Sequence, residues 1–161
     1  MAGSARKSVA RTGFTAANDA TDLNQVGTVM DGQSKQYRYV RVEDLALAAN
    51  DVVEYADATG MEVSQDRAGG SSLGRHFAGV ALNTVTDAYY TWVQVKGVAT
   101  CFVAALNAAV AAGARVAPHS TENGGVITAT TSTFHQAFGT ALAADTATTT
   151  ADGTVSVMID L

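Results

Sequence analysis

The chain has 161 residues, a formal net charge of −5 and one cysteine. This length fits a single domain with a substantial hydrophobic core, and the acidic balance argues against a general nucleic-acid binder. We find no secretory h-region and no run of about 18 apolar residues, so we expect neither export nor a membrane span. Cys101 has no partner for an internal disulfide, and its place in an apolar run predicts a buried thiol.

The first 35 residues are small and polar and show the period of neither a helix nor a strand. Arg6, Lys7 and Arg11 give the extreme N-terminus a charge of +3, whereas residues 36–161 carry −6. A segment of this composition buries too little apolar surface to order itself. We therefore predict an extended N-terminal arm over residues 1–35, held in place by a neighbouring subunit or a larger assembly.

A β-rich body is predicted over residues 36–161. It opens with a clean alternation at residues 36–43, where Tyr37 and Tyr39 share one face and Val40 and Val42 share the other. Further short apolar runs are separated by Gly, Asn and Asp. These runs predict strands at residues 51–56, 61–66, 77–85, 89–96, 98–105, 114–118, 126–130, 133–143 and 154–161.

The centre of the body is the stretch 77–105, which reads as three consecutive antiparallel strands. Lys96-Gly97 between two valines predicts a two-residue hairpin turn. Residues 106–113 fit either one or two helical turns or a loop over the end of a barrel, and 114–118 reads as an edge strand ended by Pro118. We predict an all-β fold, a single β-sandwich or partly closed β-barrel with an extended N-terminal arm.

Residues with catalytic or metal-binding chemistry are sparse. His76, His119 and His135 are far apart in the sequence, so a metal site that combines them with Cys101 is not expected. The glycine-rich stretch 69–74 lacks the Lys-Ser/Thr ending of a phosphate-binding loop, and no G-x-S-x-G motif is present. We expect no catalytic residues, no cofactor and no enzymatic activity.

The aromatic residues Tyr89, Tyr90 and Trp92 have two readings. They could form an exposed platform on which sugars or bases stack. We favour the second reading, in which they belong to the core and the faces of the sheet.

Six different short motifs follow one another along the body. They are Tyr-Arg-Tyr-Val at 37–40, Asn-Asp-Val-Val-Glu-Tyr at 50–55, Ala-Gly-Val-Ala at 78–81, Tyr-Thr-Trp-Val-Gln-Val-Lys-Gly at 90–97, Phe-Gly-Thr-Ala-Leu at 138–142 and Asp-Gly-Thr-Val-Ser-Val-Met-Ile at 152–159. Together they resemble the tailed-phage capsid decoration proteins, also called cement or head-stabilising proteins. The resemblance covers roughly residues 36–161 and does not include the arm.

This resemblance implies a non-enzymatic, commonly trimeric protein made in the host cytoplasm and incorporated into the virion. There it would sit on the capsid exterior and bridge neighbouring major capsid proteins. The arm then suits a docking element that binds an acidic protein surface in preference to nucleic acid. The residues expected to dock are the cations Arg6, Lys7 and Arg11 and the apolar Phe14, Leu23, Val26, Val29 and Met30.

Two other classes of function stay open from the sequence. One is a different virion component, such as a fibre base or a minor capsid protein. The other is a soluble enzyme or β-sandwich carbohydrate-binding module. An enzyme should bring titratable groups together in a pocket, and a sugar binder should expose Trp92 or the tyrosines in a groove.

Overall fold

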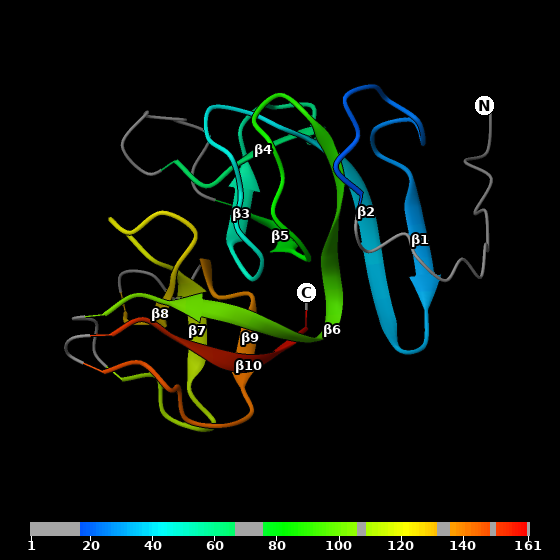
Figure 1. The fold of residues 1–161 in the computed structure, drawn as a ribbon. Coiled ribbons are helices and arrows are strands. Elements are labelled where there is room, and N and C mark those ends of the chain that lie inside the picture. The colour runs from blue at the N-terminus through cyan, green and yellow to red at the C-terminus, as the bar shows by residue number, and fades with distance from the viewer. Residues whose placement is uncertain (1–16, 67–75, 106–108, 132–135, 149–150, 161) are drawn as a thin grey trace.

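The computed structural model describes residues 17–66, 76–105, 109–131, 136–148 and 151–160, and all of its regular secondary structure in these residues is β (Figure 1). The strands are β1 (Val29–Gly32), β2 (Lys35–Val42), β3 (Val52–Tyr55), β4 (Glu62–Ser64), β5 (Phe77–Ala81), β6 (Tyr90–Val103), β7 (Arg115–Pro118), β8 (Val126–Thr128), β9 (Gly139–Ala141) and β10 (Gly153–Ile159). The predicted all-β fold is confirmed.

Five strands form a closed ring of pairings in the order β2, β4, β3, β5, β6 and back to β2. The β2–β4 pair is parallel, and the other pairs of the ring are antiparallel. Valines from β2, β3, β4 and β6 pack together in one buried cluster with Leu47 and Val85 from the connecting loops. The interior of the ring is therefore filled mainly by small aliphatic side chains, most of them valines.

The second half of β6 belongs to another sheet, whose order is β6, β10, β9, β7, β8. One face of this sheet packs on Val52, Phe77 and Val80 from β3 and β5, and the rings of Phe77 and Phe138 stack there with centroids 4.0 Å apart. The alternate residues Val155, Val157 and Ile159 of β10 are buried in this core. Cys101 lies in the same core, where burial raises the pKa of its thiol to about 12.

The predicted hairpin at Lys96-Gly97 is wrong, because β6 continues through it without a turn. Residues up to Lys96 pair with β2, whereas Gly97 to Val103 pair with β10. Gly97 has φ 86°, and a Cβ at this position would clash with the carbonyl oxygen of Ser34. The glycine is required for a bend that passes the strand from one sheet to the other, and not for a chain reversal.

Gln94 holds this bend from inside the protein. Its buried side-chain amide donates to the carbonyl oxygens of Lys96 at 3.1 Å and Val98 at 2.8 Å. These bonds satisfy carbonyl groups on both sides of Gly97, where the regular ladder is interrupted.

Helical turns and a loop were both open for residues 106–113, and the described residues 109–113 form a loop, with Gly113 at φ 80°; residues 106–108 lie outside the described residues. The strand β7 is not an edge strand, because it pairs with β9 on one side and β8 on the other. Of the predicted strand 133–143, the structure contains 139–141 as β9.

The loop at residues 48–51, together with the first residue of β3, ties the ring to the second sheet. The backbone of Asn50 accepts a bond from Phe102 of β6, and Val52 donates to Gly124 in the β7–β8 turn at 2.7 Å. Asp51 lies between these two bonds, buried, with its carboxylate accepting the amide of Ala48 at 2.6 Å. Burial raises the pKa of Asp51 to about 6, although the bond from Ala48 acts in the opposite direction.

The bend predicts a specific cost for a side chain at Gly97. Replacing it with alanine imposes a left-handed conformation on an L-residue, at about 1–2 kcal/mol, and adds the clash with Ser34, at about 1–3 kcal/mol. The matched control is Gly113→Ala, because Gly113 has a similar φ of 80° but no atom lies within 4 Å of the position that an alanine Cβ would take there. We expect urea unfolding to show that G97A loses at least about 1 kcal/mol more than G113A. Equal losses would contradict the close approach.

The buried carboxyl of Asp51 predicts a dependence of stability on pH. Its folded pKa of about 6 lies above the usual value of 3.8, so its protonated form favours the folded state. That contribution is fully present below pH 3.8 and is lost as pH rises through 6, with a total of roughly 3 kcal/mol. The neutral variant Asp51→Asn should therefore gain stability relative to the wild type between pH 4 and 7. Chemical unfolding at a series of pH values tests this, and Asp87→Asn controls for the loss of one exposed negative charge.

Candidate functional site

The described part of the predicted arm lies against its own chain, whereas the sequence led us to expect an arm held by a neighbouring subunit or a larger assembly. Residues 29–32 form β1 and pair antiparallel with the start of β2, so the expected boundary after residue 35 falls within the β1–β2 hairpin. The segment 17–28, which we call the anchor, crosses the outer side of β2 and β6 (Figure 1). Its order comes from the few apolar side chains it contributes to a patch that the strands already offer.

That patch is a cluster of aromatic side chains on the outside of the ring. Tyr39 lies between Tyr90, whose ring stacks on it with centroids 6.1 Å apart, and Trp92, whose centroid is 5.1 Å away. Ala17 and Val26 of the anchor and Met30 of β1 cover the cluster. Trp92 is only 5% exposed, which confirms the core reading for this residue and leaves it no open face on which a sugar or base could stack.

Hydrogen bonds fix the anchor at both ends. The hydroxyl of Tyr39 donates to Asp19 Oδ2 at 2.6 Å, and the backbones of Asp19 and Tyr90 exchange bonds of 3.0 and 2.9 Å. At the other end, the amide of Gly27 donates to the carbonyl of Tyr39 at 2.8 Å. Burial, together with the carboxylate of Asp19, raises the pKa of Tyr39 well above its usual range.

The start of the anchor is held beside the loop between β5 and β6. The carbonyl of Ala17 accepts from the hydroxyl of Thr91 at 2.8 Å and from the side-chain amide of Asn83 at 3.1 Å. Asn18 and Thr86 are bonded to each other through both side chain and backbone, at 3.3 and 3.0 Å. The chain preceding Ala17 is thus attached to the body at a defined point.

The predicted docking residues divide into two groups. Arg6, Lys7, Arg11 and Phe14 lie outside the described residues. The other four occupy different environments in the anchor and β1: Leu23 is 69% exposed, Val26 and Val29 are half-buried, and Met30 is only 6% exposed. Met30 packs in the chain's own aromatic cluster, so Leu23 is the member of these four that offers most of its side chain to a partner.

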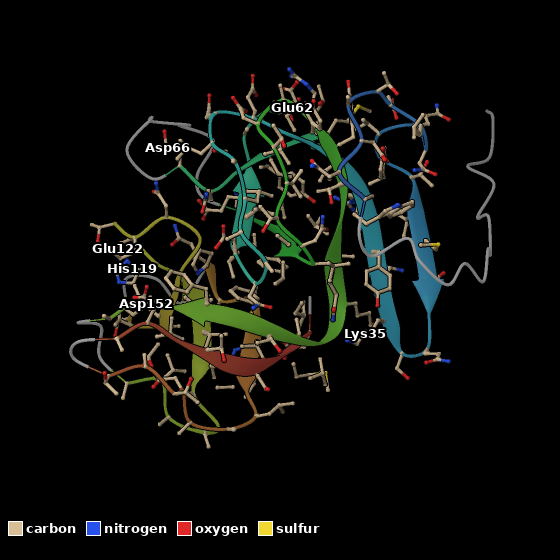
Figure 2. All side chains as sticks on the ribbon, in the orientation of Figure 1. Lys35, Glu62, Asp66, His119, Glu122 and Asp152 are labelled. Atoms are coloured by element: carbon tan, nitrogen blue, oxygen red, sulfur yellow. The ribbon has the colours of Figure 1, made fainter. Side chains whose placement is uncertain are left out.

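Among the described residues, His119 brings an imidazole close to a hydroxyl, with its Nδ1 3.5 Å from Thr121 Oγ1. Within these described ranges, no group of three or more His, Cys, Asp or Glu side chains is arranged to hold a metal ion. Figure 2 shows Lys35 and Glu62 far apart, and His119 beside Glu122 in the β7–β8 turn. His119 has a structural role there, because its Nδ1 accepts the backbone amides of Thr121 and Glu122 at 3.1 and 2.9 Å. His135 is outside the described residues.

A shallow groove lies between the β3–β4 turn and the anchor. It is lined by Gly27, Arg38, Tyr55, Asp57 and His76, among others. Its cation is already engaged, since the guanidinium of Arg38 donates to the Tyr55 hydroxyl and lies 5.7 Å from that ring's centroid. Asp57 accepts the amides of Met61 and Glu62 within its own turn. Arg38, Tyr55 and Asp57 of the groove are therefore engaged within the chain itself.

An acidic group at one end of the ring was not apparent from the sequence. Glu62 of β4 bonds Arg41 of β2 at 2.6 Å, and a hydrogen bond with Glu62 raises the pKa of the neighbouring Glu43. The parallel β2–β4 pairing places these carboxyls together, and nothing in the local sequence signals that pairing.

In the part of the chain that the structure describes, no helix is long and apolar enough to cross a membrane.

The anchor's attachment is testable through the bond between Tyr39 and Asp19. A double-mutant cycle with Tyr39→Phe and Asp19→Asn should give a coupling energy of about 1 kcal/mol or more, because the acceptor is charged and the donor is buried. Amide hydrogen exchange at Asp19 and Tyr90 should accelerate in each single variant, since the local opening of the anchor becomes easier. Additive losses with unchanged exchange would show that the bond does not fix the anchor.

The comparisons with known proteins concern the fold. No protein-family model matches the chain, and no curated protein matches its sequence. Among solved structures, the chain is similar to the crystal structure of the head fiber gp8.5 N base in bacteriophage phi29, with a TM-score of 0.51. The match covers 77% of this chain and 92% of that chain at 17% sequence identity. At this level of identity, the likeness shows a shared fold.

Proposed function

We propose that this protein is a structural component of a tailed-phage virion, attached to the head. The observation that carries the proposal is the similarity of fold to a phage head-fiber base, which covers most of both chains. The resemblance of residues 36–161 to capsid decoration proteins points to the same setting. We propose further, from what the resemblance to decoration proteins implies, that the protein is non-enzymatic and that its partner is the major capsid protein.

The anchor gives this proposal a physical basis. It holds the start of the described chain at one point beside the β5–β6 loop. A partner that binds the residues before Ala17 would therefore be linked to the body through this point. The sequence before Ala17 carries three cations and no acid, on a chain whose net charge is −5. Sixteen residues of extended chain reach at most about 55 Å, enough to contact a neighbouring capsid subunit.

The proposed docking mode is electrostatic first and apolar second. Arg6, Lys7 and Arg11 would approach acidic side chains of the capsid, while Phe14 and the exposed Leu23 would add apolar contact. Three partly exposed ion pairs contribute on the order of 0.5–1 kcal/mol each. Many copies on one shell then multiply a modest single contact, because each bound copy raises the effective concentration of its neighbours' sites.

Charge reversal in the arm tests the docking. We expect the triple variant R6E/K7E/R11E to bind capsids of the major capsid protein encoded alongside this chain at least about tenfold more weakly than the wild type. Co-sedimentation with those capsids at several salt concentrations measures this, and wild-type binding should itself weaken with salt. The variant R6K/R11K preserves every charge and serves as the matched control. Undiminished binding by the charge-reversed variant would reject the arm as the docking element.

A decoration role is a narrower form of the proposal, favoured by the sequence resemblance. A protein that bridges capsid subunits on the exterior should raise the temperature at which the capsids disassemble, measured by light scattering with and without saturating protein. A fibre base that is merely attached should bind without this rise. Both the decoration role and the fibre-base role are compatible with self-association of the protein. The same resemblance favours a trimer.

A further inference from the structure

The turn between β7 and β8 contains the one Asn-Gly pair of the sequence, Asn123 and Gly124. The side-chain carbonyl carbon of an asparagine can be attacked by the backbone nitrogen of the next residue. A Cβ on that next residue hinders the approach, and glycine has none. Every other asparagine of the chain is followed by a residue with a Cβ: Asn18, Asn24, Asn50, Asn83 and Asn107.

The fold requires glycine at position 124. Its φ is 69°, and a Cβ there would lie 2.6 Å from Asp51 Oδ1 and 2.7 Å from Gln65 Oε1. Its carbonyl accepts the amide of Val52 at 2.7 Å, so the residue is fixed where the turn meets the ring. Any other residue would be both strained and crowded. The packing of the protein therefore keeps an unhindered nitrogen next to Asn123.

This nitrogen is not engaged, and the asparagine beside it is exposed. The amides of Thr121 and Glu122 in the same turn both donate to His119 Nδ1. Within the described residues, the amide of Gly124 donates no hydrogen bond. An amide that is in a hydrogen bond has to leave it before the nitrogen can lose its proton. The Gly124 amide has no such bond to break.

We propose that Asn123 is a site of spontaneous deamidation that loosens the contact between the β7–β8 turn and the ring. The Gly124 nitrogen forms a bond to Cγ of Asn123, and the side-chain NH₂ leaves as ammonia with the proton that this nitrogen gives up. Water then opens the resulting cyclic imide at either carbonyl, which yields aspartate or isoaspartate. The net reaction consumes one water and releases one ammonia, without an oxidant or a reductant.

The isoaspartate product changes the path of the main chain. Its backbone runs through the former side chain, which inserts a methylene between positions 123 and 124. The turn is held on its two sides by the bond from Val52 to the Gly124 carbonyl and by the bond from His119 to the Gly125 carbonyl, 2.7 and 2.8 Å long. A longer chain between these bonds displaces Gly124 from Val52. Both products also add one negative charge to a chain whose net charge is −5.

This inference goes beyond the proposed function, because it describes a chemical change of the protein with age. It does not depend on the arm, on the anchor or on capsid binding. Its test uses the purified full chain alone.

The first experiment locates the reaction. The wild type is kept folded for weeks at mildly alkaline pH and physiological temperature, and its proteolytic fragments are then analysed by mass spectrometry. We expect conversion at Asn123 to be at least about tenfold faster than at any other asparagine. The control Asn123→Gln, which keeps the amide, should not accumulate the more acidic species on ion exchange. Conversion at Asn123 that is no faster than elsewhere would overturn the inference.

The second experiment measures the effect on the contact. Asn123→Asp carries the new charge without the extra methylene, so it is the matched control for the isoaspartate fraction isolated by chromatography. That fraction should unfold at a lower urea concentration than N123D and should exchange the Val52 amide hydrogen faster. Equal urea midpoints and equal exchange at Val52 would contradict the proposed loosening.

Discussion

The architecture depends on one long strand that changes sheets. β6 is hydrogen-bonded to β2 and β5 in its first half and to β10 in its second. The change needs a residue that accepts φ 86° with no side chain toward Ser34, and it needs donors for the carbonyls beside the bend, which Gln94 supplies. Without that bend, the ring and the second sheet could not be parts of one compact body.

The second constraint is the aromatic patch on the outside of the ring. Tyr39 and Trp92 alternate with residues that face the ring's interior, so their rings necessarily point outward. The anchor covers them and satisfies the buried hydroxyl of Tyr39 with Asp19. The same contacts fix the point at which the positively charged N-terminal segment joins the body. The packing of the aromatic patch and the proposed docking therefore depend on the same few residues.

Local patterns located most of the strands, β1 being the exception, but did not identify their partners. The alternation at Tyr37 and Tyr39, the buried Cys101 and the buried face of β10 follow from the period of two in the sequence. A glycine between two valines suits both a hairpin and a bend, and only the distant β10 decides in favour of the bend. The anchor was missed because Ala17, Val26 and Met30 have no regular spacing, so their common target appears only in three dimensions.

The position of β10 has a consequence for how the chain folds. β10 lies between β6 and β9, so the strands β7, β8 and β9, although made earlier, have no ladder to β6 until β10 inserts between them. The ring of β2 to β6 can close during synthesis, while the second half of β6 waits with an unpaired edge for a strand about 50 residues further along the chain. Long-range pairings of this kind form slowly. An exposed edge in the meantime invites pairing with other nascent chains, so assembly at low concentration or with a chaperone should favour the correct product.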